Sequence, residues 1–287
     1  MTLKTISAHS TRPLSTGATE TLQIPVYQRI QDVILSFDGT EAEIRAEIGL
    51  IRLSINGSDI INLTAAELYD LYEMLGVKVF NAGGTAGALS LNLAPLVYNN
   101  PAIRDQFGWG ELGVTNIQVS VTALTLSAVS SVRAFTIRDT PRDATGKPVK
   151  QTLGAHVKAV RYQQNFNATG EHTVDTLPRD LGTAYLMVAA SDGASGAITS
   201  GRCSVNSVNI YDDTPLAING LYMSRSGYDQ IGGYYVFNFV DGGLNSRLPM
   251  EGVTDLRFVQ TFGTAPGAGG YAMLSVMAVD FPANITT

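Results

Sequence analysis

Short runs in which apolar residues alternate with polar ones recur along the whole chain, and this period of two predicts β-strands. The expected strands of the first half are residues 22–26, 33–37, 50–55, 117–126 and 132–137. Those of the second half are residues 185–189, 205–211, 234–239, 256–262 and 273–279. Turn-forming pairs such as Asp38-Gly39 and Asn56-Gly57 separate the runs. The pattern therefore predicts an all-β protein.

Only two segments carry a helical pattern. Thr64 and Glu67 have the spacing of a capping box, which predicts a helix from Ala65 to Leu75. A second short helix is expected after Pro101, from Ala102 to Phe107. Neither helix follows a glycine-rich phosphate loop, and strands do not alternate with helices. A doubly wound α/β fold is therefore disfavoured.

An internal repeat divides the chain into two halves. The segment Gly113-Val-Thr-Asn-Ile117 recurs as Gly252-Val-Thr-Asp-Leu256, each time just before the last two expected strands of its half. The segment Val33–Gly39 similarly resembles Met187–Gly193. These matches occur in the same order in both halves, which indicates two copies of one β-domain.

Two shorter matches extend the repeat. Gln23-Ile-Pro25 resembles Thr176-Leu-Pro178, and we align Ile55-Asn56-Gly57 with Ile210-Tyr211-Asp212. The spacing between the matches is longer in the first half than in the second. We expect the extra length to lie in the helix from Ala65 and in the segment near Pro101.

The number of strands favours a particular β-fold. Roughly eight strands in each copy suit a jelly roll better than a seven-stranded immunoglobulin-like sandwich. We predict two tandem eight-stranded jelly rolls, a double jelly roll, with a few short helical insertions. The expected divisions are an N-terminal arm at residues 1–20, a first jelly roll at 21–140, a polar linker at 141–150 and a second jelly roll at 151–287.

Composition narrows the class of protein further. Hydrophobic residues make up 45% of the chain and charged residues only 15%, which indicates a surface largely covered by partners. The net charge of −6 and the scattered basic residues argue against direct binding to nucleic acid. The single Cys203 excludes an intrachain disulfide, and the N-terminal segment lacks the apolar core of a signal peptide. We therefore expect an unsecreted protein.

No constellation of residues predicts catalysis. The titratable candidates are three histidines and two carboxylate pairs: His9, His156 and His172, and Glu41 with Glu43 and Asp212 with Asp213. The histidines form no His-x-His pair, and the carboxylates lack the spacing of a calcium loop, so we interpret them as lightly packed imidazoles and turn acids. We predict that the chain is not an enzyme and has no catalytic, cofactor-binding or metal site.

Aromatic residues offer the remaining candidates for a binding surface. Tyrosines and phenylalanines are dense between Tyr222 and Phe239, where they form either a glycan-stacking platform or a sandwich core with interface contacts. The alternation of Tyr235, Phe237 and Phe239 favours the core. Trp109 lies between two glycines and is either a loop anchor or a subunit contact.

Several of these segments carry a family resemblance. The first half, from Gln23-Ile-Pro25 through Ile51–Gly57 to the helix of Leu63–Leu75, resembles the N-terminal jelly roll of corticovirus-type major capsid proteins. The second half, with Arg161–Phe166 and then Asp175–Arg179, resembles the beginning of that family's second jelly roll. The resemblance covers most of the chain and indicates the PRD1-adenovirus-type capsid lineage. Glycine- and alanine-rich loops and the lower charge depart from it, which also fits a related phage group with the same fold.

The resemblance implies a function and a set of partners. Such proteins are major capsid proteins of membrane-containing icosahedral bacteriophages, in which a homotrimer forms a pseudo-hexameric capsomer. It implies contacts with neighbouring capsomers, with other capsid and membrane-associated virion proteins, and with an internal lipid membrane on the inner face. The expected location is the virion capsid, preceded by the host cytoplasm before assembly. Structural Ca²⁺ is known in the family, but no residue here can be assigned to it.

Two other functions remain open at this point. A tandem jelly-roll protein that binds or processes glycans would need exposed aromatic residues beside clustered carboxylates in one cleft. A virion spike protein would use the same β-domains for receptor binding and usually carries an anchoring domain.

Overall fold

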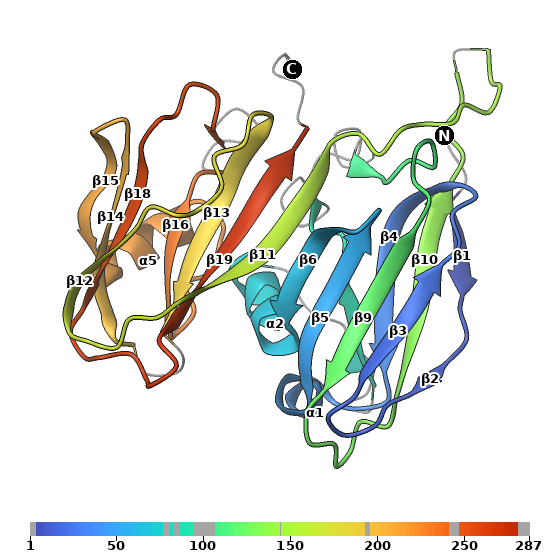
Figure 1. The fold of residues 1–287 in the computed structure, drawn as a ribbon, viewed down its shortest axis with the longest axis horizontal. Helices are drawn as coiled ribbons and strands as arrows, with labels where there is room; N and C mark the ends of the chain where they lie inside the picture. The colour runs from blue at the N-terminus through green and yellow to red at the C-terminus, as the bar shows by residue number, and fades with distance from the viewer. Residues whose placement is uncertain are drawn as a thin grey trace. The chain divides into compact units, whose positions relative to one another are not determined.

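The computed structural model describes residues 4–76, 81–82, 86–94, 107–143, 145–192, 196–240 and 247–280. The chain divides into two compact units (Figure 1). The first consists of Met1–Glu73 and Val77–Ala159, and the second of Met74–Gly76 and Val160–Thr287. Most of the helix expected from Ala102 to Phe107 lies outside the described residues.

The first unit contains two antiparallel sheets. One has the order β1 (Thr5–Ala8), β10 (Ser131–Asp139), β4 (Arg29–Phe37), β8 (Ala86–Ser90) and β7 (Asn81–Ala82), and β2 (Arg12–Pro13) also pairs with β10. The other contains β6 (Ser58–Thr64), β5 (Ile48–Ile55), β9 (Ile117–Ala123) and β3 (Thr19–Ile24). Strands that follow one another along the chain mostly fall in opposite sheets, which is the connectivity of a jelly roll.

The second unit repeats this connectivity. One sheet contains β16 (Tyr234–Asn238), β13 (Thr183–Ser191), β19 (Tyr271–Val279) and β11 (His156–Gln164), and β17 (Leu248–Pro249) also pairs with β13. The other has the order β12 (Gly170–Val174), β18 (Leu256–Phe262), β14 (Ile198–Val205) and β15 (Val208–Pro215). The predicted double jelly roll is therefore confirmed.

Alternating side chains explain why these segments form half-buried strands. In β9 the residues Ile117, Val119 and Val121 are buried and the polar residues between them are half-buried. A sheet with one apolar face needs this period of two. In β13 and β19 nearly every residue is buried, and both strands are continuous apolar runs.

The helix predicted after Thr64 is α2 (Ala65–Met74), and its capping box is present: Thr64 N donates to Glu67 Oε2 and Glu67 N donates to Thr64 Oγ1. The interpretation of this helix as extra length in the first half is wrong, because α5 (Leu216–Arg225) occupies the same place in the second half. Each helix directly follows the second strand of a hairpin, β5–β6 in one unit and β14–β15 in the other.

The extra length of the first unit has two sources, and one of them is the expected segment near Pro101. Helix α1 (Glu41–Glu47) lies between β4 and β5, whereas the equivalent connection from β13 to β14 is shorter. The connection from β8 to β9, which includes Pro101, is also longer than that from β16 to β18. Glu41 and Glu43, interpreted above as turn acids, belong to α1: Glu43 closes a capping box with Thr40, and Glu41 accepts from Arg45 Nε at 2.8 Å.

The N-terminal segment also differs from the prediction. An arm was expected at residues 1–20, but Thr5–Ala8 pairs with Phe135–Arg138 of β10, and Arg12 pairs with Val132. The linker was expected at residues 141–150. These residues instead belong to the first unit, and they form a closed loop because Val149 N donates to Pro141 O. By strand order the second jelly roll begins with β11, which crosses the division between the units.

The repeat Gly113–Ile117 and Gly252–Leu256 has a structural cause. In the first unit Asn56 Nδ2 donates to Gly113 O, and Asn56 Oδ1 accepts from the backbone of Thr115 and Asn116. In the second unit Asn206 makes the same bonds to Gly252 O and to the backbone of Thr254 and Asp255.

Each asparagine thus ties a hairpin turn to the loop before the next strand. Asn56 and Asn206 both adopt positive φ, at 51° and 47°, which asparagine tolerates better than most residues. The counterpart of Ile55-Asn56-Gly57 is therefore Val205-Asn206-Ser207, and the alignment with Ile210–Asp212 is wrong. The strand expected at 205–211 is interrupted at Asn206 and Ser207 by the turn between β14, which ends at Val205, and β15, which begins at Val208.

Replacing Asn206 by alanine is expected to destabilise the second unit by about 1–2 kcal/mol, because one donor and three acceptances are lost at an exposed turn. Asn56→Ala should have a similar effect on the first unit. The measurement is urea unfolding followed by circular dichroism. Asn209→Ala is the matched control, since that side chain is exposed and donates one hydrogen bond, to Asp212 Oδ1 at 2.8 Å, among the described residues. Equal stabilities of the Asn206 and Asn209 variants would contradict this role.

Candidate assembly surface

The three histidines lie in different strands and loops of the structure. His9 Nε2 lies 3.1 Å from Thr136 Oγ1 between β1 and β2, and burial together with Arg138 and Arg133 lowers its pKa. His156 begins β11, with Nδ1 3.1 Å from Gly154 O. His172 in β12 stacks on Phe166 and has Nδ1 2.8 Å from Tyr271 Oη, and burial lowers its pKa. The three imidazoles do not form a common site.

The described part of the chain contains neither a metal-binding cluster nor a helix suited to span a membrane. Among the described residues, no group of three or more His, Cys, Asp or Glu side chains could hold a metal ion. Within that part, none of the helices has the length and apolar character needed to cross a bilayer.

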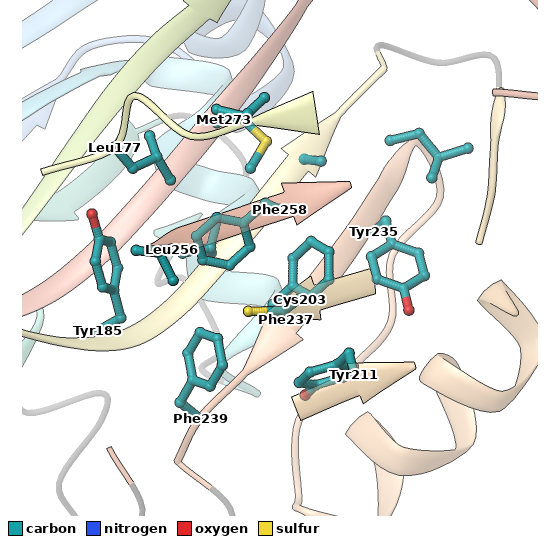
Figure 2. Packing of buried hydrophobic residues seen from close by; sticks show 14 of the residues in the cluster. Leu177, Tyr185, Cys203, Tyr211, Tyr235, Phe237, Phe239, Leu256, Phe258 and Met273 are labelled. Atoms are coloured by element: carbon teal, nitrogen blue, oxygen red, sulfur yellow. The ribbon is translucent and has the colours of Figure 1, made fainter. Parts of the chain in front are cut away.

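The aromatic residues of the second half mainly build a core. Phe237 and Phe258 have ring centroids 5.1 Å apart, and Figure 2 shows Tyr235, Phe239 and Leu256 around them. All of these side chains are buried, so the prediction of core packing is confirmed for this strand. Cys203 is buried in the same cluster, and burial raises the pKa of its thiol to about 12. Trp109 is also buried and exchanges backbone hydrogen bonds with Ile30, so within the first unit it is a loop anchor.

One end of this aromatic cluster opens into a groove on the second unit. The groove has a volume of about 500 Å³ and lies between β15 and α5. Its walls are mainly apolar and aromatic, and its lining residues include Ile210, Tyr211, Ile218, Tyr222 and Phe239. Tyr211 is anchored at the bottom, because its hydroxyl donates to Asn238 O and accepts from Asn238 N.

The groove also contains an unused hydrogen-bond donor. Asn238 lines it and is only 2% exposed, and its Oδ1 accepts from Val240 N. Its Nδ2 is buried and has no hydrogen-bond partner among the residues that the structure describes. A buried donor without a partner costs roughly 1–3 kcal/mol, so a group that supplies an acceptor would be stabilised there.

Apolar side chains surround the groove on the exposed surface. Val208 is 67% exposed, Ile218 55% and Leu221 61%, and Ile210 projects from the same strand. β15 is the outer strand of its sheet, paired with β14 alone in that sheet (Figure 1). Exposed apolar residues gathered on an edge strand and an adjacent helix mark an interaction surface. We call the surface made by β15 and α5 the groove surface.

Helix α5 shows why this surface was missed in the sequence. It begins after Pro215 without a side-chain cap, and it contains Asn219 and Gly220, which are poor helix formers. Its exposed residues include the apolar Ala217, Ile218 and Leu221 beside Ser224 and Arg225, so the helix lacks a clear division into a polar face and a buried apolar stripe. Asn219 is buried and exchanges hydrogen bonds with the backbone of Val236, which fixes the helix on β16. This contact is long-range and leaves no local signal.

A second exposed edge lies on the first unit. β1 is the outer strand of its sheet, and Ile6 on it is 72% exposed. Lys4 and Arg12 are exposed on the same segment, which contains no carboxylate between residues 4 and 13. We call the segment of residues 4–13 the basic edge.

A buried guanidinium adds to the positive charge of this edge. Arg138 pairs with Thr5 in the sheet, and its side chain is fully buried. It donates to Thr136 Oγ1 and Pro25 O and stacks on the ring of Tyr27, while its Nη1 has no partner among the described residues. Burial lowers the pKa of Arg138, which reflects the missing carboxylate.

Two carboxylates on β15 give the groove surface the opposite charge. Asp212 accepts from Asn209 Nδ2 at 2.8 Å, and Asp213 accepts from Ser200 Oγ at 2.8 Å. Both are exposed, and Asp213 has positive φ at an irregularity of the strand. They were predicted to be turn acids and instead lie in a strand. No basic residue occurs between Val208 and Ile218.

Comparison with known proteins gives a consistent result. Residues 5–138 match the family model of the viral coat protein P2 N-terminal domain, and residues 157–272 match that of the P2 C-terminal domain. No curated protein sequence matches the chain significantly.

Solved structures support the same fold at low sequence identity. The major capsid protein P2 from Bacteriophage PM2 has a TM-score of 0.80 and 13% identity, covering 98% of this chain and 99% of that chain. The major capsid protein of Sulfolobus Turreted Icosahedral Virus has a TM-score of 0.65 and 13% identity, covering 96% and 97%. The PBCV-1 virus capsid protein has a TM-score of 0.58 and 12% identity, covering 97% and 93%.

Two jelly rolls in one chain, exposed edges suited to assembly and these matches together define a double jelly-roll major capsid protein. Because the two domain models follow one another and cover most of its length, the chain belongs to the viral coat protein P2 family. It is a structural protein of the virion capsid, not an enzyme. The interpretation as a glycan-processing or spike protein is not favoured.

Proposed function

We propose that three copies of this chain form a pseudo-hexameric capsomer of an icosahedral shell. The observation that carries the proposal is the repeated connectivity of the two units, each a jelly roll with the same strand order. Three chains with two similar domains each, one that ends with β10 and one that begins with β11, would give six similar blocks around a threefold axis. Closed symmetry of this kind buries complementary edges in every copy.

We further propose that the shell encloses an internal membrane and that its inner face contacts this membrane and other virion proteins. The family resemblance of the P2 domains supports this arrangement. The net charge of −6 is unfavourable for direct contact with packaged nucleic acid. In this proposal the chain folds in the host cytoplasm before it joins the capsid.

Size-exclusion chromatography with light scattering on the full chain tests the capsomer. We expect a mass of three chains that does not change with modest dilution, and hexagonal arrays in negative-stain electron micrographs at high protein concentration. A stable monomer that binds glycans would contradict the proposal. Electron cryomicroscopy of particles that contain this protein should show a lipid bilayer beneath the shell, and its absence would reject the membrane contact.

A further inference from the structure

We propose that the groove surface of one copy binds the basic edge of a second copy, so that the contact is head-to-tail. The groove surface comprises β15 and α5 with the groove between them, and the basic edge comprises residues 4–13. This inference rests on the proposed function, because it names the surfaces through which the copies would associate.

Charge complementarity selects this partner. The groove surface carries Asp212 and Asp213 on β15 and one basic residue, Arg225, which is the last residue of α5. The basic edge carries Lys4 and Arg12 and no carboxylate. Two copies of the groove surface facing each other would instead bring like charges together. Opposite charges across an interface fix the register and suppress wrong partners.

Apolar contacts would supply the central part of the interface. The groove surface presents Ile210, Ile218 and Leu221, and the basic edge presents Ile6, which is 72% exposed although it lies in a paired strand. Such side chains gain roughly 25 cal/mol for each Å² that association removes from water. A groove of about 500 Å³ has room for one or two apolar side chains of a neighbouring chain.

Two buried polar groups without hydrogen-bond partners also support a contact between these two surfaces. Asn238 lines the groove and its buried Nδ2 lacks an acceptor among the described residues, so a rotation of this side chain would let it donate to a backbone carbonyl of a neighbouring chain. The guanidinium of Arg138 lies beneath the basic edge with Nη1 unpaired, so a carboxylate placed over this edge would gain from its charge. The groove surface therefore lacks a hydrogen-bond acceptor and the basic edge lacks a carboxylate, and each of these groups is present on the other surface.

The contact predicts a specific behaviour of single variants. Ile218→Asp changes an exposed position of α5, and Ile6→Asp changes an exposed position of β1, so both chains should fold. Each should weaken self-association at least about tenfold, because an unpaired charge would be buried in the interface. Light scattering should detect monomers at concentrations where the unchanged chain is associated.

Mixing the two variants is the decisive experiment. The Ile218→Asp chain keeps an intact basic edge, and the Ile6→Asp chain keeps an intact groove surface. An equimolar mixture should therefore form a dimer of one chain of each kind, and it should not form larger closed rings. A mixture that remains monomeric would overturn the head-to-tail contact.

The charges are tested separately. Arg12→Glu and Asp212→Lys should each weaken association, and the two changes in one chain should restore it, most clearly at low salt. Failure of the double variant to recover would reject this charge pair and with it the proposed register. Leu181→Asp is the control, since Leu181 is 81% exposed in the second unit but lies outside the groove surface.

The outcomes separate this inference from the proposed function. If the unchanged chain is a trimer and both Ile6→Asp and Ile218→Asp remain trimers, the capsomer stands and the proposed contact is wrong. If only one of the two variants dissociates, the surfaces do not bind each other. If the unchanged chain is a monomer, the proposed function itself fails. Circular dichroism and thermal unfolding of every variant distinguish loss of association from loss of folding.

Discussion

Replacing Phe258 by alanine is expected to destabilise the second jelly roll by about 3–5 kcal/mol, the usual cost of removing a fully buried phenylalanine. Phe258 is 0% exposed and contacts the rings of Tyr185, Phe237 and Phe239 at centroid distances of 6.2, 5.1 and 6.4 Å. Its removal would leave a cavity where both sheets of the unit meet (Figure 2). Since many domains are stable by only 5–15 kcal/mol, we also expect a loss of soluble protein.

Urea unfolding followed by tyrosine fluorescence and circular dichroism measures this effect. The matched control is Arg257→Ala, the preceding residue of β18, whose side chain is exposed and pairs with Asp255 at 2.9 Å. An exposed ion pair of this kind contributes at most about 1 kcal/mol. If the two variants unfolded at the same urea concentration, the aromatic cluster would not be the main core of this unit.

The first jelly roll is expected to lose stability as the pH rises from about 4 to 7. Asp32 on β4 is buried, and burial raises its pKa to about 7, although hydrogen bonds from Ser90 Oγ at 2.6 Å and Asn92 N at 3.1 Å favour the charged form. The unfolded chain has a pKa near 3.8 for this group. The folded state therefore holds more protons between these two values, and stability falls as the proton is lost.

The size of this effect follows from the difference between the two pKa values. It is on the order of 4 kcal/mol between pH 4 and pH 8. Most of the change should lie below pH 7, and stability should be level above it. A carboxylate with a lowered pKa has the opposite effect on the pH dependence of stability. Hydrogen bonds from Ser127 and Val129 lower the pKa of Glu47 to about 2. Its contribution to stability is therefore complete above about pH 5 and is lost as the pH falls toward 2.

Asp32→Asn isolates the contribution of this one carboxyl group. The amide can accept from Asn92 N and donate to Ser90 Oγ without ionising, so the variant should be more stable than the unchanged chain at pH 8 and similar to it at pH 4. Asp38→Asn is the control, because hydrogen bonds from Ser130 and Ser131 outweigh its partial burial and lower its pKa. Urea unfolding at both pH values measures the difference. A parallel pH dependence of the Asp32 variant and the unchanged chain would contradict the burial of a neutral acid.

The positions of the buried cores and of the exposed apolar residues suit a capsid protein. Each unit holds its own apolar core, and exposed apolar residues gather on strands that end a sheet. The low charge of the chain, which first suggested covered surfaces, agrees with these edges. A chain of this kind functions through the contacts between its copies.

The sequence by itself determined the fold class, because β-strands and their turns are specified by local patterns. Buried residues alternate with half-buried ones in the strands around Val33–Phe37 and Ile117–Ala123, as a half-buried sheet requires. The capping box of Thr64 and Glu67 predicts the start of α2. The duplication was visible because the Asn56 and Asn206 turns need nearly the same loop sequence in both copies. The capping box of Thr40 and Glu43 was equally local and could have revealed α1.

Only the tertiary structure decided which surfaces are exposed. The segment of Thr5–Ala8 has no distinctive pattern, and its pairing with β10 joins residues more than 120 positions apart. Helix α5 is fixed by the hydrogen bonds between Asn219 and Val236. The groove exists because Tyr211 of β15, Tyr222 of α5 and Phe239, just after β16, meet there. Exposure of an apolar residue depends on what the rest of the chain covers, and no local pattern records that. For this reason the sequence pointed to a protein that assembles, and the fold was needed to find the surfaces proposed for assembly.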